Sequence, residues 1–413
     1  MQTHTRAFGC RIVIAVAAVF LGVPSPASAA EAGAPEGDPE DSSSTAEQGE
    51  GLTDLLDVHG FVSPGWMKSF RNDYLAKGSS SARGSFEFTE AGLNFTLPVA
   101  DRLRAGLQLF ARDLGPVGSY TARFDWFYLD YRWADWLGLR AGRTKIPFGL
   151  YNEVSDVDVA LQPILLPQSI YPLRNRDFLL AQTGGELYGD VPLPKVGTLE
   201  YRLYGGTIFL DLNELGVARS PATEIFAVDV PYLWGGRLLW QTPLEGLRVG
   251  PSLLWTRLDL DAAIGGAPVR ARLPAFIWIV SAEYAAGDLT LAAEYSRWRV
   301  KLESSDPALV PSSDTTSERY YALAAYRLAG WFQPCIYYAG TFPDVSRRRP
   351  REAHQHDFAL SLRFDLNEHW LAKLEGHYMN GTAGTTSDVN DGVALSELAN
   401  DWGVILVKTT VYF

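Results

Sequence analysis

Apolar and polar residues alternate along most of the chain from Leu52 onward. The runs 103–109, 199–204 and 358–364 place an apolar residue at nearly every second position, with mostly polar or small residues between them. A period of two is the pattern of a β-strand with one apolar and one polar face. No uncharged apolar stretch approaches the roughly 18 residues of a membrane-spanning helix. The pattern therefore predicts an all-β chain.

Connections of two lengths alternate between these strands. Short ones are expected at 98–101, 134–136, 192–197, 243–246, 286–288, 329–331 and 366–369, and long ones at 68–83, 114–120, 147–181, 211–231, 259–271, 303–316, 341–353 and 380–401. Seven short and eight long connections join sixteen strands and put both chain ends on the side of the short turns. This layout predicts a transmembrane antiparallel β-barrel of a bacterial outer membrane. Eighteen strands are the alternative count, and a soluble β-sandwich is the alternative fold.

The segment from Trp402 to Phe413 supports a barrel. Every second residue from Gly403 to Phe413 lies on one largely apolar face, and Lys408, Thr410 and Tyr412 lie on the other face. A soluble protein would need another layer to cover that apolar face, whereas a barrel turns it toward lipid. We therefore expect this strand to close the barrel.

The first 51 residues differ in composition from the rest. Arg6 and Arg11 precede an apolar run over 12–23, and an A-x-A pattern ends at Ala29, so we predict a signal peptide over 1–29; a membrane anchor is the alternative. Residues 30–51 are acidic and rich in Ser, Gly and Pro, which predicts a flexible periplasmic leader. The barrel is then expected over 52–413.

The composition limits the classes of molecule that the protein is expected to bind. The chain carries 36 basic and 48 acidic residues, a formal charge of −12, which argues against nucleic acid. Aromatic residues make up 12% of the chain, as interfacial girdles of a barrel would require. We expect contact with lipid and lipopolysaccharide of the outer membrane and with small polar solutes or anions, and we expect no cofactor and no metal.

A sixteen-stranded barrel is too wide for side chains to fill its interior. The longest internal connection, 147–181, contains apolar residues such as Val157, Ile164 and Leu165, which a solvated loop would not favour. We therefore expect this third external loop to fold into the lumen. An external position against neighbouring loops, or a trimer contact, is the alternative.

The stretch just before this loop carries a family resemblance. Residues 139–149, LRAGRTKIPFG, resemble the R-x-G-R-x-K-x-P-F-G signature of the phosphate-selective porin O and P family, and the segments 125–131 and 408–413 are similar as well. The resemblance implies a sixteen-stranded, homotrimeric porin whose third external loop enters the pore. Phosphate selectivity in that family depends on a ladder of Arg and a cluster of Lys, but this chain has only seven Lys.

Strand alternation predicts which charged residues face the lumen, and acids and bases are nearly balanced among them. A transverse field with bases on one side and acids on the other would favour small hydrophilic solutes. The expected constriction and solute contacts are Arg140, Glu153, Asp156, Asp158, Arg174, Arg176 and Asp177, and the expected lumen wall includes Arg104, Arg132, Arg202, Arg237 and Lys373.

These patterns predict a porin for passive diffusion of small hydrophilic solutes or ions, either unselective or weakly selective for anions. A channel specific for phosphate, phosphorylated solutes or sugars is the alternative. An outer-membrane hydrolase is a third reading, because His354 and His356 lie near Asp357 and Ser361, and His377 shares a face with Glu375. No nucleophile is evidently placed to use them, so we expect no enzyme.

Overall fold

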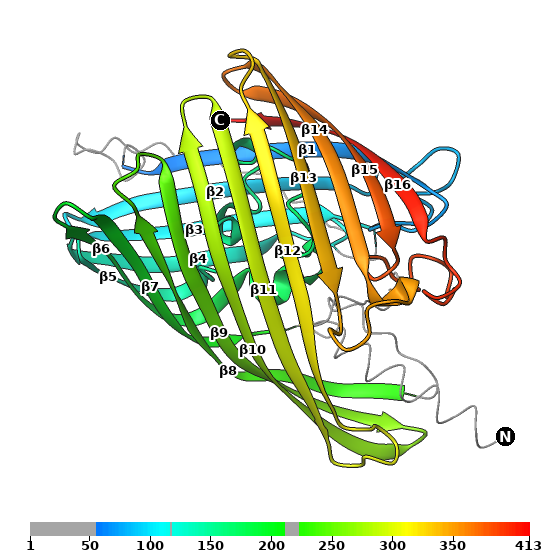
Figure 1. Ribbon diagram of the computed structural model, residues 1–413. Coiled ribbons are helices and arrows are strands. Elements are labelled where there is room, and N and C mark those ends of the chain that lie inside the picture. The colour runs from blue at the N-terminus through cyan, green and yellow to red at the C-terminus, as the bar shows by residue number, and fades with distance from the viewer. Residues whose placement is uncertain (1–54, 116–117, 211–222) are drawn as a thin grey trace, which may run out of the picture.

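The computed structural model describes residues 55–115, 118–210 and 223–413. The predicted signal peptide and leader lie outside the described residues. Within them the chain forms a closed barrel of sixteen antiparallel strands, in which each strand pairs with its sequence neighbours and β1 pairs with β16 (Figure 1). The predicted sixteen strands are confirmed. No helix of the described part is long and apolar enough to cross a membrane.

The strands are β1 Asp57–Phe70, β2 Thr89–Ala100, β3 Leu103–Asp113, β4 Arg123–Ala134, β5 Leu137–Lys145, β6 Ala181–Leu193, β7 Gly197–Ile208, β8 Thr223–Gln241, β9 Leu247–Ile264, β10 Ala267–Ala286, β11 Leu289–Ser304, β12 Ser313–Tyr326, β13 Phe332–Phe342, β14 Gln355–Asn367, β15 Trp370–Gly381 and β16 Asp401–Tyr412. The short helical elements are η1 Asn152–Val154, η2 Asp158–Ala160, η3 Leu173–Asn175, α2 Arg176–Leu179 and η4 Arg351–Ala353. All but η4 lie between β5 and β6.

Short turns gather at one end of the barrel and long loops at the other. Each of the seven predicted short turns falls between two strands, and the C-terminus lies at the short-turn end (Figure 1). The prediction of a long loop at 259–271 is wrong, because β9 and β10 continue to a two-residue turn, Gly265-Gly266. Both glycines have positive φ, 59° and 83°, which a tight hairpin of this kind requires.

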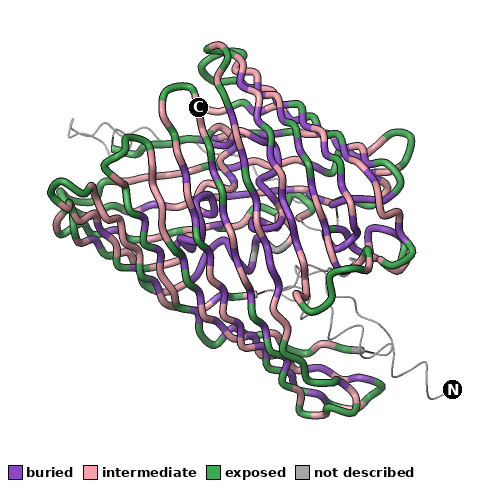
Figure 2. Tube along the Cα trace, in the orientation of Figure 1, coloured by how far each residue is buried: buried purple, intermediate pink, exposed green. Residues whose placement is uncertain are grey.

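The ends of β8–β11 beside this turn project past their neighbours, as Figure 1 shows. We call residues 223–230, 257–264, 267–274 and 297–304 the extension. Its inward side chains are apolar and buried, including Leu258, Leu260 and Leu273, whereas its outward side chains include Arg257 and Arg270 (Figure 2). The expected polar lumen wall is therefore absent from this part of the barrel, where the polarity of the two faces is reversed.

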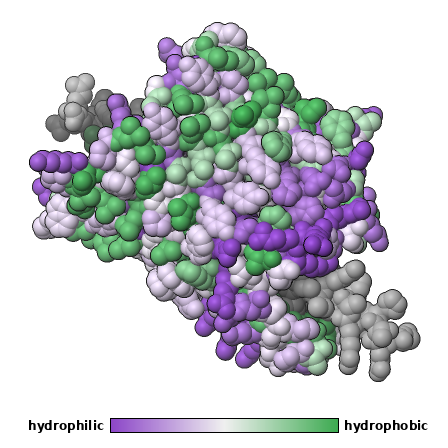
Figure 3. All heavy atoms as spheres, in the orientation of Figure 1, coloured by the Kyte–Doolittle hydropathy of each residue, from purple (hydrophilic) through white to green (hydrophobic). Residues whose placement is uncertain are grey.

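Outside the extension, the outer surface of the barrel is apolar. Exposed apolar side chains include Phe127, Leu129, Ile336, Phe358 and Leu360. The outward residues Ile405, Val407 and Val411 of β16 are exposed as predicted, and the final Phe413 is 63% exposed. Figure 3 shows apolar side chains over much of the front wall, with hydrophilic ones gathered toward the ends that carry the long loops.

Candidate functional site

The connection between β5 and β6, residues 146–180, lies inside the barrel, and we call it loop L3. It carries η1, η2, η3 and α2. Its polar groups contact strands on several sides of the lumen: Ser169 donates to the carbonyl of Tyr320 on β12, and Arg363 on β14 donates to the carbonyls of Val159 and Leu161. The prediction that the third external loop folds into the lumen is confirmed.

Asp158, in η2, attaches L3 to β15 and β16. Its carboxylate accepts hydrogen bonds from Lys373 at 3.0 Å and from Thr410 at 2.7 Å, and Lys408 lies 3.6 Å away. Lys373 also donates to three carbonyls of L3, those of Asp158, Leu161 and Pro163. Burial alone would raise the pKa of Asp158, but the charges of Lys373 and Lys408 hold it well below its ordinary value. Asp158 is therefore a charged anchor and not an open solute contact.

A second attachment uses Glu375 of β15. Its carboxylate accepts from the backbone N–H groups of Ile164, at 2.5 Å, and Leu165, at 3.0 Å. His377 bonds Glu375 through Nε2 at 2.9 Å and Asp357 through Nδ1 at 2.9 Å. Both ring nitrogens are thus occupied by carboxylates, and all of these side chains are buried. The histidine has no nitrogen left to activate a serine, so this geometry gives the hydrolase reading no support.

A third attachment joins Glu153 and Asp156 of L3 to bases and an amide on β3, β5, β7 and β8. Glu153 bonds Arg202 at 2.8 Å and Arg237 at 2.9 Å. Asp156 bonds Lys145 and accepts from Gln108 at 2.7 Å. Burial would raise the pKa of both carboxyls, but the neighbouring bases hold both below their ordinary values, and that of Asp156 falls to about 2. Arg202, Arg237 and Lys145 therefore attach the loop to the wall.

Arg176 strengthens the same side. Its guanidinium forms a two-pronged contact with Asp125 at 2.8 and 2.6 Å, and it lies over the ring of Phe110 at 4.3 Å. Asp156 lies 3.5 Å from the same group. These contacts leave the side chain only 5% exposed. Arg176 is thus part of the attachment of L3, and the geometry does not present it to a solute.

Apolar contacts hold the middle of L3 against β9–β12. Phe148 packs edge-on against Trp298 with ring centres 6.2 Å apart, and Ile170 is fully buried. The Tyr171 hydroxyl bonds Glu294, which also accepts from the N–H of Leu150 at 2.9 Å. Burial and the charge of Glu294 raise the pKa of Tyr171 well above its ordinary range, so its hydroxyl stays a donor.

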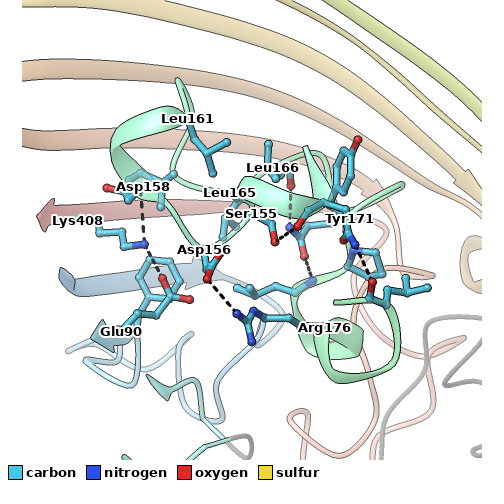
Figure 4. A pocket seen from close by; sticks show the side chains of 17 residues that line it. Glu90, Ser155, Asp156, Asp158, Leu161, Leu165, Leu166, Tyr171, Arg176 and Lys408 are labelled. Atoms are coloured by element: carbon cyan, nitrogen blue, oxygen red, sulfur yellow. Dashed lines mark hydrogen bonds and ion pairs between the residues drawn. The ribbon is translucent and has the colours of Figure 1, made fainter. Parts of the chain in front are cut away.

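Little space remains between L3 and the wall at its charged end. A cavity of about 40 Å³ lies there, lined in part by Glu90, Asp156, Asp158, Arg176 and Lys408 (Figure 4). That volume holds only a few water molecules. The acids of L3 and the bases of the wall are in direct contact here. The expected transverse electric field across an open lumen is therefore absent at this level of the barrel, where acids and bases form direct ion pairs.

The remaining predicted site residues fall in different places. Arg140 lies on the lumen wall, 3.4 Å from Asp130 and 3.7 Å from Glu186, with its guanidinium over the ring of Tyr188 at 4.4 Å. Arg174 lies at the external side, where it bonds Asp388 at 2.9 Å. Asp177 is in α2, and its side chain is outside what the structure describes.

The lumen wall nearer the short turns pairs bases with acids, and at three of these pairs the base is the more exposed partner. Arg104 is 52% exposed beside Asp130 at 0%, and Arg248 is 35% exposed beside Glu283 at 11%. Arg327 is 35% exposed beside Asp365 at 20%. Arg132 bonds Asp135 of the adjoining turn at 3.2 Å. The acid is the more exposed partner where Arg132, at 49%, meets Asp135, at 89%, and where Arg237, at 7%, meets Glu200, at 20%. Guanidinium groups are therefore the more accessible charges at Arg104, Arg248 and Arg327, and not along the whole wall.

Sequence reasoning missed the anchoring roles of Glu375, Glu294 and Arg363. Alternation placed all three on the inward face, but nothing in the sequence pairs them with L3. Glu375 and Ile164, for example, are 211 residues apart. Only the closed barrel brings such positions together.

No family model and no curated protein matches the sequence, so the resemblance to phosphate-selective porins stays a prediction. Solved structures do match. They include an anion-selective porin from Comamonas acidovorans (12% identity, TM-score 0.54, covering 87% of this chain and 99% of that one) and OmpF of Salmonella typhi in complex with daunomycin (12%, 0.52, 87% and 97%). A third is the outer membrane channel DcaP of Acinetobacter baumannii (11%, 0.50, 87% and 97%).

At these identities the likeness shows the fold alone, which is that of outer-membrane porins. A closed barrel needs no further backbone partners in lipid, and this one has an apolar outer surface. Barrels of this kind span bacterial outer membranes. The protein is therefore an integral β-barrel of a bacterial outer membrane.

Proposed function

We propose that the protein is a porin for passive diffusion of small hydrophilic solutes and ions, with a weak preference for anions. The observation that carries the proposal is the wall near the short turns, where bases and acids pair and Arg104, Arg248 and Arg327 are more exposed than the acids they bond. Arg104 and Asp130, at 52% and 0% exposure, are the clearest case. A strong filter would concentrate one sign of charge at a constriction, whereas paired charges leave only a small imbalance.

Two further features support this function. Every L3 carboxylate with a described side chain is bonded to a wall base, so L3 adds little free negative charge to the lumen. Arg140, 18% exposed between two tyrosine rings, keeps a guanidinium within reach of the lumen. A planar guanidinium fork suits carboxylate and phosphate groups. One of the structural neighbours is an anion-selective porin, which agrees with this direction.

The test is the reversal potential of purified protein in a planar bilayer under a salt gradient. We expect ohmic, non-saturating currents with a small bias toward chloride. The triple variant Arg104→Gln, Arg248→Gln and Arg327→Gln should shift the bias toward cations. A matched triple, Arg270→Gln, Arg297→Gln and Arg299→Gln, removes the same charge from the outer face of the extension and should leave the reversal potential unchanged.

Other outcomes would replace the proposal. A current that saturates with phosphate, or with a sugar, would support the substrate-specific alternative. The absence of any conductance in purified protein would refute a diffusion channel. Homotrimeric assembly stays a prediction, which the mass of the detergent-solubilised protein would test.

A further inference from the structure

Arg140 differs from its neighbours on the lumen wall because its guanidinium donates no hydrogen bond to the residues that the structure describes. Its nearest acids, Asp130 and Glu186, lie 3.4 and 3.7 Å away, and its buried Nε has no hydrogen-bond partner. Each of these acids already has another base, since Arg104 bonds Asp130 at 2.7 Å and Arg202 bonds Glu186. The N–H donors of Arg140 are therefore available to a solute.

Two tyrosine rings flank this guanidinium. Its central carbon lies over the ring of Tyr188 on β6 at 4.4 Å and over the ring of Tyr128 on β4 at 5.3 Å. Tyr128 pairs with Gly142 in the register of the barrel, and Tyr188 pairs with Gly138. Because Gly138 and Gly142 lie on either side of Arg140 along β5, the two rings approach it from opposite directions. A Cβ at Gly138 would lie 2.2 Å from the ring of Tyr188, so this glycine makes room for the ring.

The rings and the neighbouring acids limit what can bind to Arg140. Its side chain is 18% exposed, whereas those of Asp130 and Glu186 are 0% exposed, so a solute reaches the base but not the acids. The rings cover the faces of the guanidinium and leave its edge to the lumen. Aromatic faces carry partial negative charge and offer no hydrogen-bond donor. The site is therefore suited to an anionic group that is flat.

We propose that Arg140, between Tyr128 and Tyr188, binds small carboxylate monoanions in preference to phosphate. The inference rests on the proposed diffusion channel and names the class of solute that its wall favours. A carboxylate is planar and bonds the edge of a guanidinium through two parallel hydrogen bonds. A phosphate held in the same way has further oxygens above and below that plane, where they face ring surfaces instead of water or donors. Inorganic phosphate is also partly a dianion at neutral pH, so the buried charges of Asp130 and Glu186 repel it more strongly.

The experiment follows the single-channel chloride current of the full-length protein in a planar bilayer while sodium acetate or sodium phosphate is added at constant chloride and matched ionic strength. Acetate bound at Arg140 should lower the chloride current at a concentration about tenfold below that required of phosphate. Arg140→Gln removes the charge-assisted hydrogen bonds and should weaken the effect of acetate about tenfold. The matched control Arg327→Gln removes the same charge elsewhere on the wall and should leave the difference between acetate and phosphate unchanged.

Further variants separate the shape of the site from its charge. Arg140→Lys keeps the charge but loses the planar fork, so acetate and phosphate should become about equally effective. Tyr188→Leu removes one ring and should have the same result, whereas Tyr188→Phe keeps the ring and should retain the preference for acetate. Asp130 and Glu186 keep their other bases in the Arg140 variants, so these barrels should close normally, seen as unchanged heat-modifiable migration in detergent gels.

The possible results distinguish the site from the channel. Equal effects of acetate and phosphate on the unaltered protein, or a preference for acetate that survives Arg140→Gln, would overturn the site and leave the diffusion channel intact. A preference that survives both Arg140→Lys and Tyr188→Leu would overturn the role of the planar fork and the rings. The absence of any chloride current in the unaltered protein would refute the channel, and the site with it.

Discussion

Replacing Asp158 by Asn should weaken the attachment of residues 157–166 of L3 to the barrel wall. The substitution keeps the size of the side chain but leaves Lys373, 1% exposed, without its bonded carboxylate. Removing one partner of a buried ion pair costs about 3–5 kcal/mol. Lys373 keeps three carbonyl acceptors and Lys408 keeps Glu90 at 2.8 Å, so we expect the lower end, about 3 kcal/mol.

A cost of about 3 kcal/mol corresponds to a change of roughly 150-fold in the ratio of attached to detached loop. Glu375 still bonds Ile164 and Leu165, and Arg363 still bonds Val159 and Leu161, so residues 157–166 should loosen without leaving the lumen. Hydrogen exchange measured by mass spectrometry should show faster exchange in this segment, while the strands stay protected. Single-channel conductance should become larger or noisier, because the freed segment no longer holds one position in the lumen.

A control and a second variant make the test specific. Glu352→Gln breaks an exposed ion pair with Arg347 and should have an effect within about 1 kcal/mol. Combining Asp158→Asn with Lys373→Met removes the unpaired buried charge, so the double variant should lose less than the sum of the two single effects. Unaltered exchange over 157–166 in the Asp158 variant, together with strict additivity, would refute the anchoring role.

Three further predictions follow from the same contacts. The pKa of the Asp158 carboxyl is lowered in the folded protein, so the stabilisation that its charge gives to the attachment of L3 is fully present above the ordinary carboxyl pKa of about 3.9 and is lost as the pH falls below that value. Single-channel conductance should therefore be constant from neutral pH to about pH 4 and change only in stronger acid. Trp298→Ala removes the packing against Phe148 and Arg319 and should lower the free energy of unfolding by about 3–5 kcal/mol, measured by urea denaturation of the folded barrel. Gly266→Ala forces a positive φ on a residue with a side chain and should cost about 1 kcal/mol at the tip of the extension, with no change in conductance.

The architecture could be predicted from the sequence because the strands and turns of a barrel are determined by local sequence patterns. Alternation located the strands, turn residues located the short connections, and the apolar composition of 147–181 indicated a loop that needs a wall. The extension was misread because charged residues such as Asp259 and Arg270 resemble a solvated loop. Leu258, Leu260 and Leu273 continue the same alternation there, with the apolar residues facing inward instead of outward. The local sequence gives the period-two alternation of a strand. Whether its apolar face points toward lipid or toward the lumen depends on whether that part of the strand lies within the membrane.

The partners of L3 could not be derived in the same way. Each anchor joins the loop to a strand far along the chain, and its partner depends on the register of the closed barrel. Arg174 and Arg176 show the consequence: both were expected to contact solute, yet Arg176 attaches the loop to Asp125 and Arg174 joins Asp388 of the last external loop. A charged residue on the inward face can attach L3 to the wall or contact solute, and only the interatomic distances in the folded barrel distinguish these two roles.

The anchors of Asp158 also set an order of assembly. Lys373 belongs to β15, and Lys408 and Thr410 belong to β16, so every side chain that bonds or neutralises Asp158 comes from the last two strands. L3 should therefore complete its attachment only after β16 has paired with β1. Lys408→Met is expected to leave closure intact, seen as unchanged heat-modifiable migration in detergent gels, but to raise hydrogen exchange over 157–166. If the variant failed to close at all, the attachment of L3 would be a condition of closure and not its result.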